Sequence, residues 1–270
     1  MLGSVVASND QADVLDFWFG TITDGFADDE HRSMWFAPTA QFDATIKTRF
    51  GELMQQAAQG VREKTGNPNV SWVVGDLTTE AGRAAIVAAC PDADILINNN
   101  AGPRPGKFLE WDRERWNAAI EGNMLAPIFM IRALLPGMRQ RKFGRIVNIT
   151  SAMVKAPRPH QGLSSAARSG LTALCKAISR ESVVDNVTIN NILPERIQSP
   201  RTEYLAQRMM AEEGITHEQA MRNIIGTIPA GRMGKPEEVG AACAFLCSVQ
   251  ASYICGQNLQ LDGGAYPGLI

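Results

Sequence analysis

Residues 145–168 read RIVNITSAMVKAPRPHQGLSSAAR, and this stretch decides the fold class. Residues 146–150 are rich in β-branched side chains, which favour a buried strand that ends at Ser151. Residues 163–185 are then rich in alanine and leucine, which predicts a helix. A strand followed by a helix is the repeating unit of a parallel sheet covered by helices.

The same alternation of strand and helix extends along the chain from about residue 60. Strands are expected at residues 70–74, 94–98, 145–149, 187–193 and 258–261. Further helices are expected at residues 80–89, 113–139 and 236–248. Residues 61–270 are therefore expected to form one α/β domain, a Rossmann-like parallel sheet in three layers.

An insertion at residues 198–234 interrupts this alternation. Residues 202–213 and 218–225 have helical spacing, and Thr216 with Gln219 resembles a capping box. Ligands of parallel sheets bind beyond the carboxyl ends of the strands, so an insertion after a strand is placed to act as a lid. The alternative is a peripheral helical hairpin.

Residues 1–60 differ from the rest of the chain in composition. They concentrate aromatic residues such as Phe17 and Trp18, and residues 42–59 have the period of an amphipathic helix. We therefore expect an aromatic-rich, mainly helical N-terminal segment that packs on the core. The join to the α/β domain is expected near Gly60.

Composition limits the classes of partner. The formal charge of −2 and the isoelectric point near 6.0 give no basic field for nucleic acid or an anionic membrane. The five cysteines lack Cys-x-x-Cys spacing, so we expect reduced thiols and no metal site. No basic segment precedes an apolar core at the N-terminus, and no apolar run approaches the roughly 20 residues that cross a bilayer. A cytoplasmic protein is expected.

Several separated motifs occur in the order of a known family. They are the turn at Asp76, Asn99-Asn100-Ala101-Gly102, Asn123, Ser151, Asn190-Asn191-Ile192-Leu193-Pro194, Pro236-Glu237-Glu238-Val239 and Asp262-Gly263-Gly264. From about residue 60 to 270 the chain resembles the short-chain dehydrogenase/reductase family, and within it the 3-oxoacyl-carrier-protein reductases. The resemblance implies an oxidoreductase that uses NAD or NADP and forms a homo-oligomer, a dimer or a tetramer. The first 60 residues resemble the start of an unrelated bacterial helical family of unknown function, so the chain looks like a fusion.

The resemblance also implies roles for the retained residues. Ser151 would polarise the carbonyl group of a small-molecule substrate, and Asn123 would hold a water molecule of the proton relay. The adenine and ribose of the cofactor would lie near the turn at Asp76 and near the loop formed by Asn99, Asn100, Ala101 and Gly102. Turn formation and bracing between strands explain the same residues without a cofactor.

The sequence departs from the family at three places. The family's Tyr, thirteen residues after the serine, is Ser164 here, and its Lys, four residues further, is Arg168. A glycine loop with Gly at both +4 and +6 is absent from the sequence, which removes the turn that binds diphosphate. The sheet is therefore expected to be truncated at its first strand. Gly20 and Gly25 would supply a substitute turn if residues 14–19 formed that strand.

These departures predict impaired or altered redox chemistry. An aliphatic alcohol is a much weaker acid than a phenol, so Ser164 is a poor proton donor near neutral pH. The fixed charge of Arg168 suits contact with a ribose or an anion better than proton transfer. Binding of NAD or NADP is left open by these losses, and in a reductase Ser164 or water would donate the proton.

Two other functions fit the sequence. In a serine hydrolase of esters, lactones or similar activated carbonyls, Ser151 would be the nucleophile, and Lys155 and His160 the nearby bases. The other alternative is a non-catalytic remnant that keeps the fold and oligomerises through its helices. Tyr204 and Arg208, one helical turn apart in the insertion, would act as a replacement donor only if the lid closes.

Overall fold

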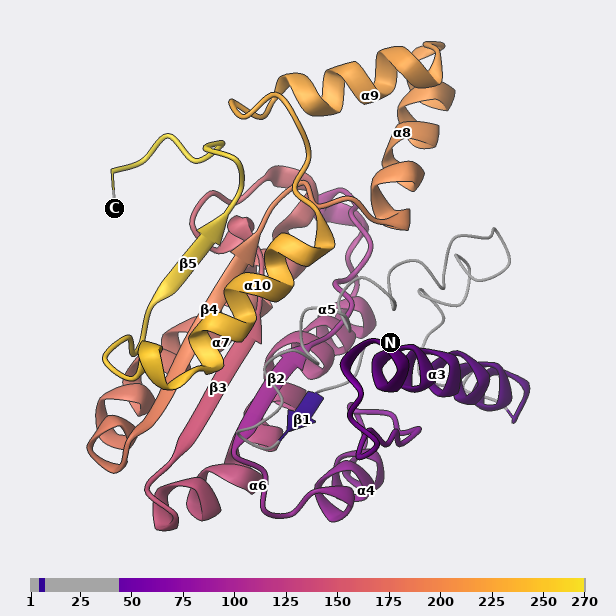
Figure 1. Ribbon diagram of the computed structural model, residues 1–270. Helices are drawn as coiled ribbons and strands as arrows, with labels where there is room; N and C mark the ends of the chain where they lie inside the picture. The colour runs from indigo at the N-terminus through magenta and orange to yellow at the C-terminus, as the bar shows by residue number, and fades with distance from the viewer. Residues whose placement is uncertain (1–4, 8–43, 270) are drawn as a thin grey trace.

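A computed structural model describes residues 5–7 and 44–269 of the chain (Figure 1). The substitute strand and turn expected at residues 14–25, and the aromatic residues Phe17 and Trp18, lie outside the described residues. The helix expected at residues 42–59 is present from Ala44 onward.

Five strands form one sheet, in the order in which they occur along the chain. They are β1 (Val5–Ala7), β2 (Ile95–Asn99), β3 (Gly144–Ile149), β4 (Val187–Pro194) and β5 (Asn258–Leu261). β2 to β5 are parallel, whereas β1 runs antiparallel to β2. The predicted Rossmann-like parallel sheet is therefore confirmed, and a short antiparallel strand occupies the position beside β2.

The prediction of a strand at residues 70–74 is wrong, because this segment has no strand structure. β1 occupies the sheet edge beyond β2, so the segment has no strand to pair with. Trp72 is 38% exposed in consequence. The guanidinium of Arg62 instead ties the segment to the preceding helix, because its Nε donates to the Val70 carbonyl at 3.0 Å.

The helices agree with the sequence pattern to within a few residues. They are α3 (Ala44–Thr65), α4 (Glu80–Ala89), α5 (Arg113–Ile120), α6 (Ala126–Gln140), α7 (Gly162–Ser182), α8 (Pro200–Glu213), α9 (His217–Gly226) and α10 (Pro236–Cys247). A π-helical turn, Glu121–Leu125, joins α5 to α6. α3 is continuous through Gly60, so the join that we predict there coincides with no break in secondary structure.

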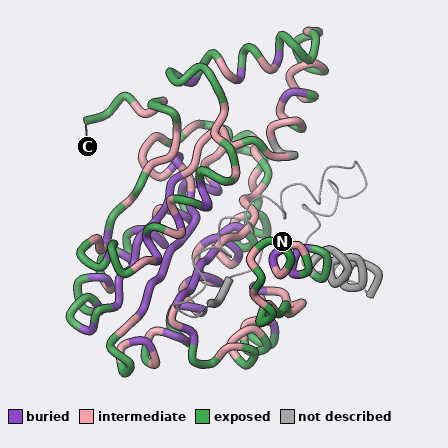
Figure 2. Tube along the Cα trace, viewed as in Figure 1, coloured by how far each residue is buried: buried purple, intermediate pink, exposed green. Residues whose placement is uncertain are grey.

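Helices cover both faces of the sheet, which makes the three layers (Figure 1). On one face Leu96 and Ile146 pack with Met130 of α6, together with α4 and α7. On the other face Val147 packs with Leu246 of α10. The buried residues run along β2, β3 and β4 (Figure 2). Burying each of these large side chains contributes about 2 kcal/mol, so the core holds the carboxyl ends of these strands in place.

The expectation that no segment reaches membrane-spanning length needs a correction. α5, the π-helical turn and α6 form a continuous helix, Arg113–Gln140, which by length and composition alone is apolar enough to cross a membrane. Its apolar side chains Met130, Ile131, Leu134 and Met138 are buried in the core against the sheet. A core helix has the same composition as a membrane span, and this packing accounts for it.

The insertion forms a helical hairpin beyond the carboxyl ends of the strands (Figure 1). α8 and α9 pack on each other through Ala206, Ala220 and Ile224, which form a cluster separate from the sheet. The predicted capping box is confirmed, because Gln219 N donates to Thr216 Oγ1 and Thr216 N donates to Gln219 Oε1. The hairpin therefore has its own small core, and it is placed above the sheet edge where ligands of such folds bind.

Candidate functional site

A row of asparagine side chains crosses the sheet, from near the carboxyl ends of β2 and β3 to the start of β5. Asn98, Asn148, Asn191 and Asn258 pair in register on β2, β3, β4 and β5. Asn98 donates to Asn148 Oδ1 at 2.9 Å, Asn148 donates to Asn191 Oδ1 at 3.0 Å, and Asn191 donates to Asn258 Oδ1 at 2.8 Å. The first three are buried, so these bonds satisfy amide groups that would otherwise be costly in the core. This asparagine ladder locks the strand register.

α7 lies over this ladder with one buried stripe. Ser164, Arg168, Leu171 and Cys175 are all buried, and their spacing places them on one face of the helix. Asn148 Nδ2 lies 3.3 Å from Cys175 Sγ. Burial raises the pKa of the Cys175 thiol to about 12, which makes it a packing residue rather than a nucleophile.

Arg168 clamps α7 to the ends of two strands. Its Nη1 donates to the carbonyls of Ile149 at 2.8 Å and Thr150 at 3.0 Å, and its Nη2 donates to the Asn100 carbonyl at 2.9 Å. Its Nε donates to Ser164 Oγ at 3.2 Å, and the residue is only 8% exposed. The guanidinium is therefore a structural clamp, and the ribose contact that we expected of Arg168 stays a prediction.

Two serine hydroxyls are anchored in the same way beside this clamp. Ser151 Oγ accepts a hydrogen bond from Met153 N at 3.2 Å, and Ser164 Oγ accepts the one from Arg168. A hydroxyl that accepts an N–H bond keeps its own proton to donate elsewhere. Ser151, Ser164 and Arg168 line one cleft of about 280 Å³, together with Gly102. The structure thus brings together these predicted residues of the site.

The two bases expected for a hydrolase lie elsewhere. Lys155 Nζ lies 5.5 Å from the centre of the Tyr266 ring. His160 is exposed, and its carbonyl accepts from Gly106 N. Neither side chain is among the cleft-lining residues of the described chain, so neither of the two predicted bases shares the cleft with Ser151. The hydrolase alternative gains no support from the structure.

Asn123 lies in the π-helical turn, next to the Arg168 clamp. Its Nδ2 donates to the Ala101 carbonyl at 2.8 Å, whereas its buried Oδ1 has no hydrogen-bond partner among the described residues. A cavity of about 20 Å³ is lined by Asn123, Asn99, Asn100 and Arg168. This volume holds one water molecule, and the free acceptor is a suitable partner for it. The geometry therefore fits the predicted water-holding role of Asn123.

The strand-end loop after β2 is held by its own side chain. Asn100 Nδ2 donates to the Gly122 carbonyl at 2.8 Å, and Asn100 Oδ1 accepts from Ala101 N at 2.9 Å. Asn99 ends β2 and lines the small cavity, and Gly102 lines the cleft. The loop therefore spans from one cavity to the other.

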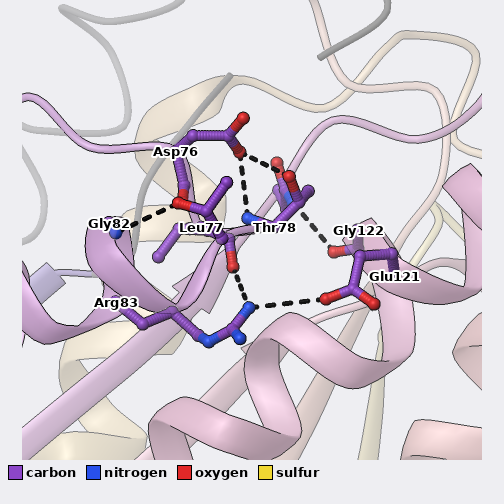
Figure 3. Close-up of polar contacts among 9 residues, drawn as sticks. Asp76, Leu77, Thr78, Gly82, Arg83, Glu121 and Gly122 are labelled. Carbon is purple, nitrogen blue, oxygen red and sulfur yellow. Dashed lines mark hydrogen bonds and ion pairs between the residues drawn. The ribbon is translucent and has the colours of Figure 1, made fainter. Parts of the chain in front are cut away.

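The turn at Asp76 is built by local hydrogen bonds (Figure 3). Asp76 Oδ1 accepts from Thr78 N at 2.9 Å and from Thr78 Oγ1 at 2.7 Å. Arg83 of α4 bridges this turn to the π-helical turn, because its Nη1 donates to the Leu77 carbonyl at 2.7 Å and lies 3.4 Å from Glu121 Oε1. These contacts explain Asp76 as a turn residue, and its predicted contact with adenine stays a prediction.

The sheet edge beside β2 is the part that differs most from a dinucleotide-binding fold. Antiparallel pairing puts Ala7, the last residue of β1, beside Ile95, the first residue of β2. The chain therefore leaves β1 at the edge opposite to the one where Asn99 ends β2. A diphosphate cradle needs a turn after a parallel strand at the carboxyl edge, and within residues 5–7 and 44–269 no such turn is present there.

Comparison with known proteins decides the family. The family model described as enoyl-(acyl carrier protein) reductase matches residues 44–266, which is most of the chain. The chain belongs to the short-chain dehydrogenase/reductase family. The match begins at Ala44, where α3 starts, so it includes part of the segment that we expected to be foreign.

Relatives of this short-chain dehydrogenase/reductase are reductases. The NADPH-dependent reductase BacG of Bacillus subtilis is 30% identical over 228 residues, which cover 83% of this chain and 88% of BacG. The 3-oxoacyl-[acyl-carrier-protein] reductase FabG of Vibrio cholerae is 30% identical over 187 residues, or 69% of this chain and 72% of FabG. The structure of L-sorbose reductase from Gluconobacter frateurii with NADPH and L-sorbose superposes with a TM-score of 0.76 at 28% identity, covering 81% and 84% of the two chains.

Sequence reasoning missed two of the arginines of the cleft in this short-chain dehydrogenase/reductase. Arg158 and Arg196 line it, with Glu195, which forms an ion pair with Arg158. Arg196 has φ of 55°, a left-handed conformation that costs a side chain of this kind about 1 kcal/mol. The available signal was the sequence Pro194-Glu195-Arg196 directly after a predicted strand, where a charged pair at the ligand-binding edge is unusual for packing alone.

Proposed function

We propose that this chain is a reductase of a small carbonyl compound, and that it works slowly because serine replaces the phenol as proton donor. The proposal rests mainly on the similar hydrogen bonds that hold the hydroxyl groups of Ser151 and Ser164. Each Oγ accepts an N–H bond, and both hydroxyls line the same cleft, so both protons are available to one carbonyl oxygen. Two donors on one oxygen form a site for developing negative charge.

Arg168 supports this site from behind. Its guanidinium touches the oxygen of Ser164 and is fixed by three backbone carbonyls, so its positive charge does not move away during the reaction. A fixed charge in a partly dry site favours an oxyanion without reorganisation. Ser164 then orients the oxygen, while water or Ser164 gives the final proton at a cost in rate.

The names of the relatives support NADPH as the reductant, which supplies a hydride when bound. On this chain Asp76 and the Asn99 to Gly102 loop would hold its adenosine and ribose end. Asn123 would hold a water molecule beside the reacting group. The described residues supply no diphosphate cradle beside β2, so the affinity for NADPH is expected to be weak. A homo-oligomer remains our prediction for the assembly.

Cofactor titration followed by turnover tests this proposal. NADPH is titrated against the intrinsic fluorescence of the five tryptophans, and then NADPH consumption is followed with short 3-oxo esters as substrates. Ser151→Ala and Ser164→Ala are each expected to lower kcat/KM by roughly 10-fold to 100-fold. Ser252→Ala, at an exposed serine away from the cleft, is the control and is expected to leave the rate unchanged.

Two results would count against the reductase. One is the lack of any saturable fluorescence change at millimolar NADPH. The other is a wild-type rate of turnover in both Ser151→Ala and Ser164→Ala. Hydrolysis of a p-nitrophenyl ester that is abolished in Ser151→Ala would instead support the serine hydrolase.

A further inference from the structure

We propose that the cleft contains an anion-binding subsite centred on Arg196, which takes a carboxylate or phosphate group of the ligand. This inference deepens the proposed function, on which it rests for the identity of the reacting group, and it names the substrate class as anionic carbonyl compounds. Arg158 and Arg208 line the same cleft and add positive charge, although each forms an ion pair, with Glu195 and Glu212 respectively.

The first observation is that Arg196 has unused hydrogen-bonding capacity in the cleft. It follows the end of β4 and is half-buried, yet its Nε is buried without a hydrogen-bond partner in the described chain. Other buried arginines of the described chain are satisfied. Arg145 donates to the carbonyls of Ser248, Gly144 and Asn186, and Arg168 donates to three strand-end carbonyls. A half-buried guanidinium with an unpaired N–H donor is stabilised when a ligand supplies a hydrogen-bond acceptor.

The second observation is the balance of charge around the cleft. Its lining carries four arginines and a single carboxylate, Glu195. That carboxylate forms an ion pair with Arg158, and its negative charge offsets only part of the lowering of the Arg196 pKa. Burial lowers the pKa of Arg196, and the positive charge of Arg158 lowers it further. A bound anion would relieve this repulsion between the two guanidinium groups.

The third observation is the shape of the cleft. It spans about 280 Å³ from the serine pair, Ser151 and Ser164, to Arg196 and the lid residue Arg208. This volume suits a small molecule rather than a polymer. A ligand that fills it would carry a carbonyl group at the serine end and an anion at the arginine end. The planar fork of a guanidinium matches the two oxygens of a carboxylate or a phosphate.

A binding assay without turnover tests the subsite. Wild type, Arg196→Gln and Arg196→Lys are titrated calorimetrically with acetoacetate, with its neutral methyl ester and with inorganic phosphate. The control is Arg222→Gln, which removes an exposed guanidinium of α9 that pairs with Glu218. Wild type and the control should bind the anions equally. Arg196→Gln should bind them at least about tenfold more weakly, and Arg196→Lys should fall between, because a charged hydrogen bond is lost or loosened.

Comparison of the three ligands also identifies the source of the anion. Tighter binding of acetoacetate than of its ester, lost in Arg196→Gln, supports a substrate carboxylate. Binding of phosphate that NADPH competes away supports a phosphate of the cofactor. Equal anion binding by folded Arg196→Gln and wild type, or no saturable binding of either anion by wild type, would overturn the subsite. Because the assay needs no hydride transfer, a failure of the reductase proposal is recorded separately by the turnover experiment.

Discussion

The carboxyl edge of the sheet has two halves that differ in how firmly the chain builds them. Around β3 and β4, buried hydrogen bonds fix the asparagine ladder, Arg168 and Ser164. Beside β2, the described edge of the sheet is β1, a strand of three residues that runs antiparallel to β2. The difference teaches that, among the described residues, the groups around β3 and β4 are held by buried hydrogen bonds, whereas the edge beside β2 depends on one short strand.

The two halves also differ from the family in different ways. In the substrate half, around β3 and β4, the departures that we predict are single side chains, Ser164 and Arg168. In the diphosphate half, beside β2, the departure that we predict is topological, because β1 runs antiparallel to β2. A side chain can be restored by one substitution, whereas a strand cannot. The variants below test that contrast, first through stability and finally through catalysis.

The largest effect is expected from Arg168→Met. Removing the guanidinium leaves the carbonyls of Ile149, Thr150 and Asn100 without this donor in the buried core, so the free energy of unfolding should fall by about 3 kcal/mol. Urea unfolding followed by circular dichroism measures it. Arg222→Met, at an exposed pair, should cost about 0.5 kcal/mol or less. Equal costs for the two variants would show that the clamp is not structural.

A smaller loss is expected when the asparagine ladder is cut in its middle. Asn148→Ala leaves the amide of Asn98 and the carbonyl oxygen of Asn191 without their partner, which should cost about 2 kcal/mol. Asn258→Ala removes the half-buried end of the ladder and should cost less than about 1 kcal/mol. Thermal unfolding compares them. If the end variant costs more than the middle one, the ladder does not act as a continuous network.

Deletion of residues 1–7 probes the other half of the comparison. β1 is a three-residue edge strand, so its loss should cost only about 1 kcal/mol. The edge groups of β2 can then bond to water. Urea unfolding of the shortened chain measures this cost. A loss as large as that of Arg168→Met would mean that the outer edge is as integral to the fold as the substrate half.

The smallest effect concerns the segment that follows the lid. Arg232 and the backbone of Lys235 hold the pKa of Glu238 at about 2, below its ordinary value of 4.5. A lowered carboxyl pKa gives stability that is present above pH 4.5 and is lost as the pH falls through about 2. Glu238→Gln should therefore be slightly less stable at neutral pH, and the difference should vanish in strong acid. A difference that is constant from neutral pH to strong acid would contradict this origin.

Much of the frame could be predicted because it depends on local pattern. Buried parallel strands are continuous apolar runs, and caps such as Thr216 with Gln219 are sequence signals. The segment at residues 70–74 shows the limit, because it has a strand composition but no neighbour to pair with. Strand direction at β1 depends on partners far away in the sequence, and composition does not record it.

The site divides in the same way. Ser151, Ser164 and Arg168 could be located by their spacing, since helix and strand geometry carry them to one place. Whether Arg168 faces a ligand or the backbone could not be read from the sequence, because the carbonyls that it binds belong to two different strands. For Arg196, Nε lacks a partner in a structure where Glu195 forms its ion pair with Arg158. Such pairings depend on packing, which the sequence pattern does not record.

Restoring the lost side chains tests the central claim most directly. Ser164 is one of the residues that line the cleft, and kcat and the KM for NADPH are measured in Ser164→Tyr, Arg168→Lys and the double variant. We predict that the double variant raises kcat by at least about 100-fold, because a phenolic general acid is regained. The KM for NADPH should stay well above the micromolar range in wild type and in Ser164→Tyr, because the edge beside β2 is unchanged. A wild-type KM in the low micromolar range, or an unchanged kcat in the folded double variant, would contradict the account.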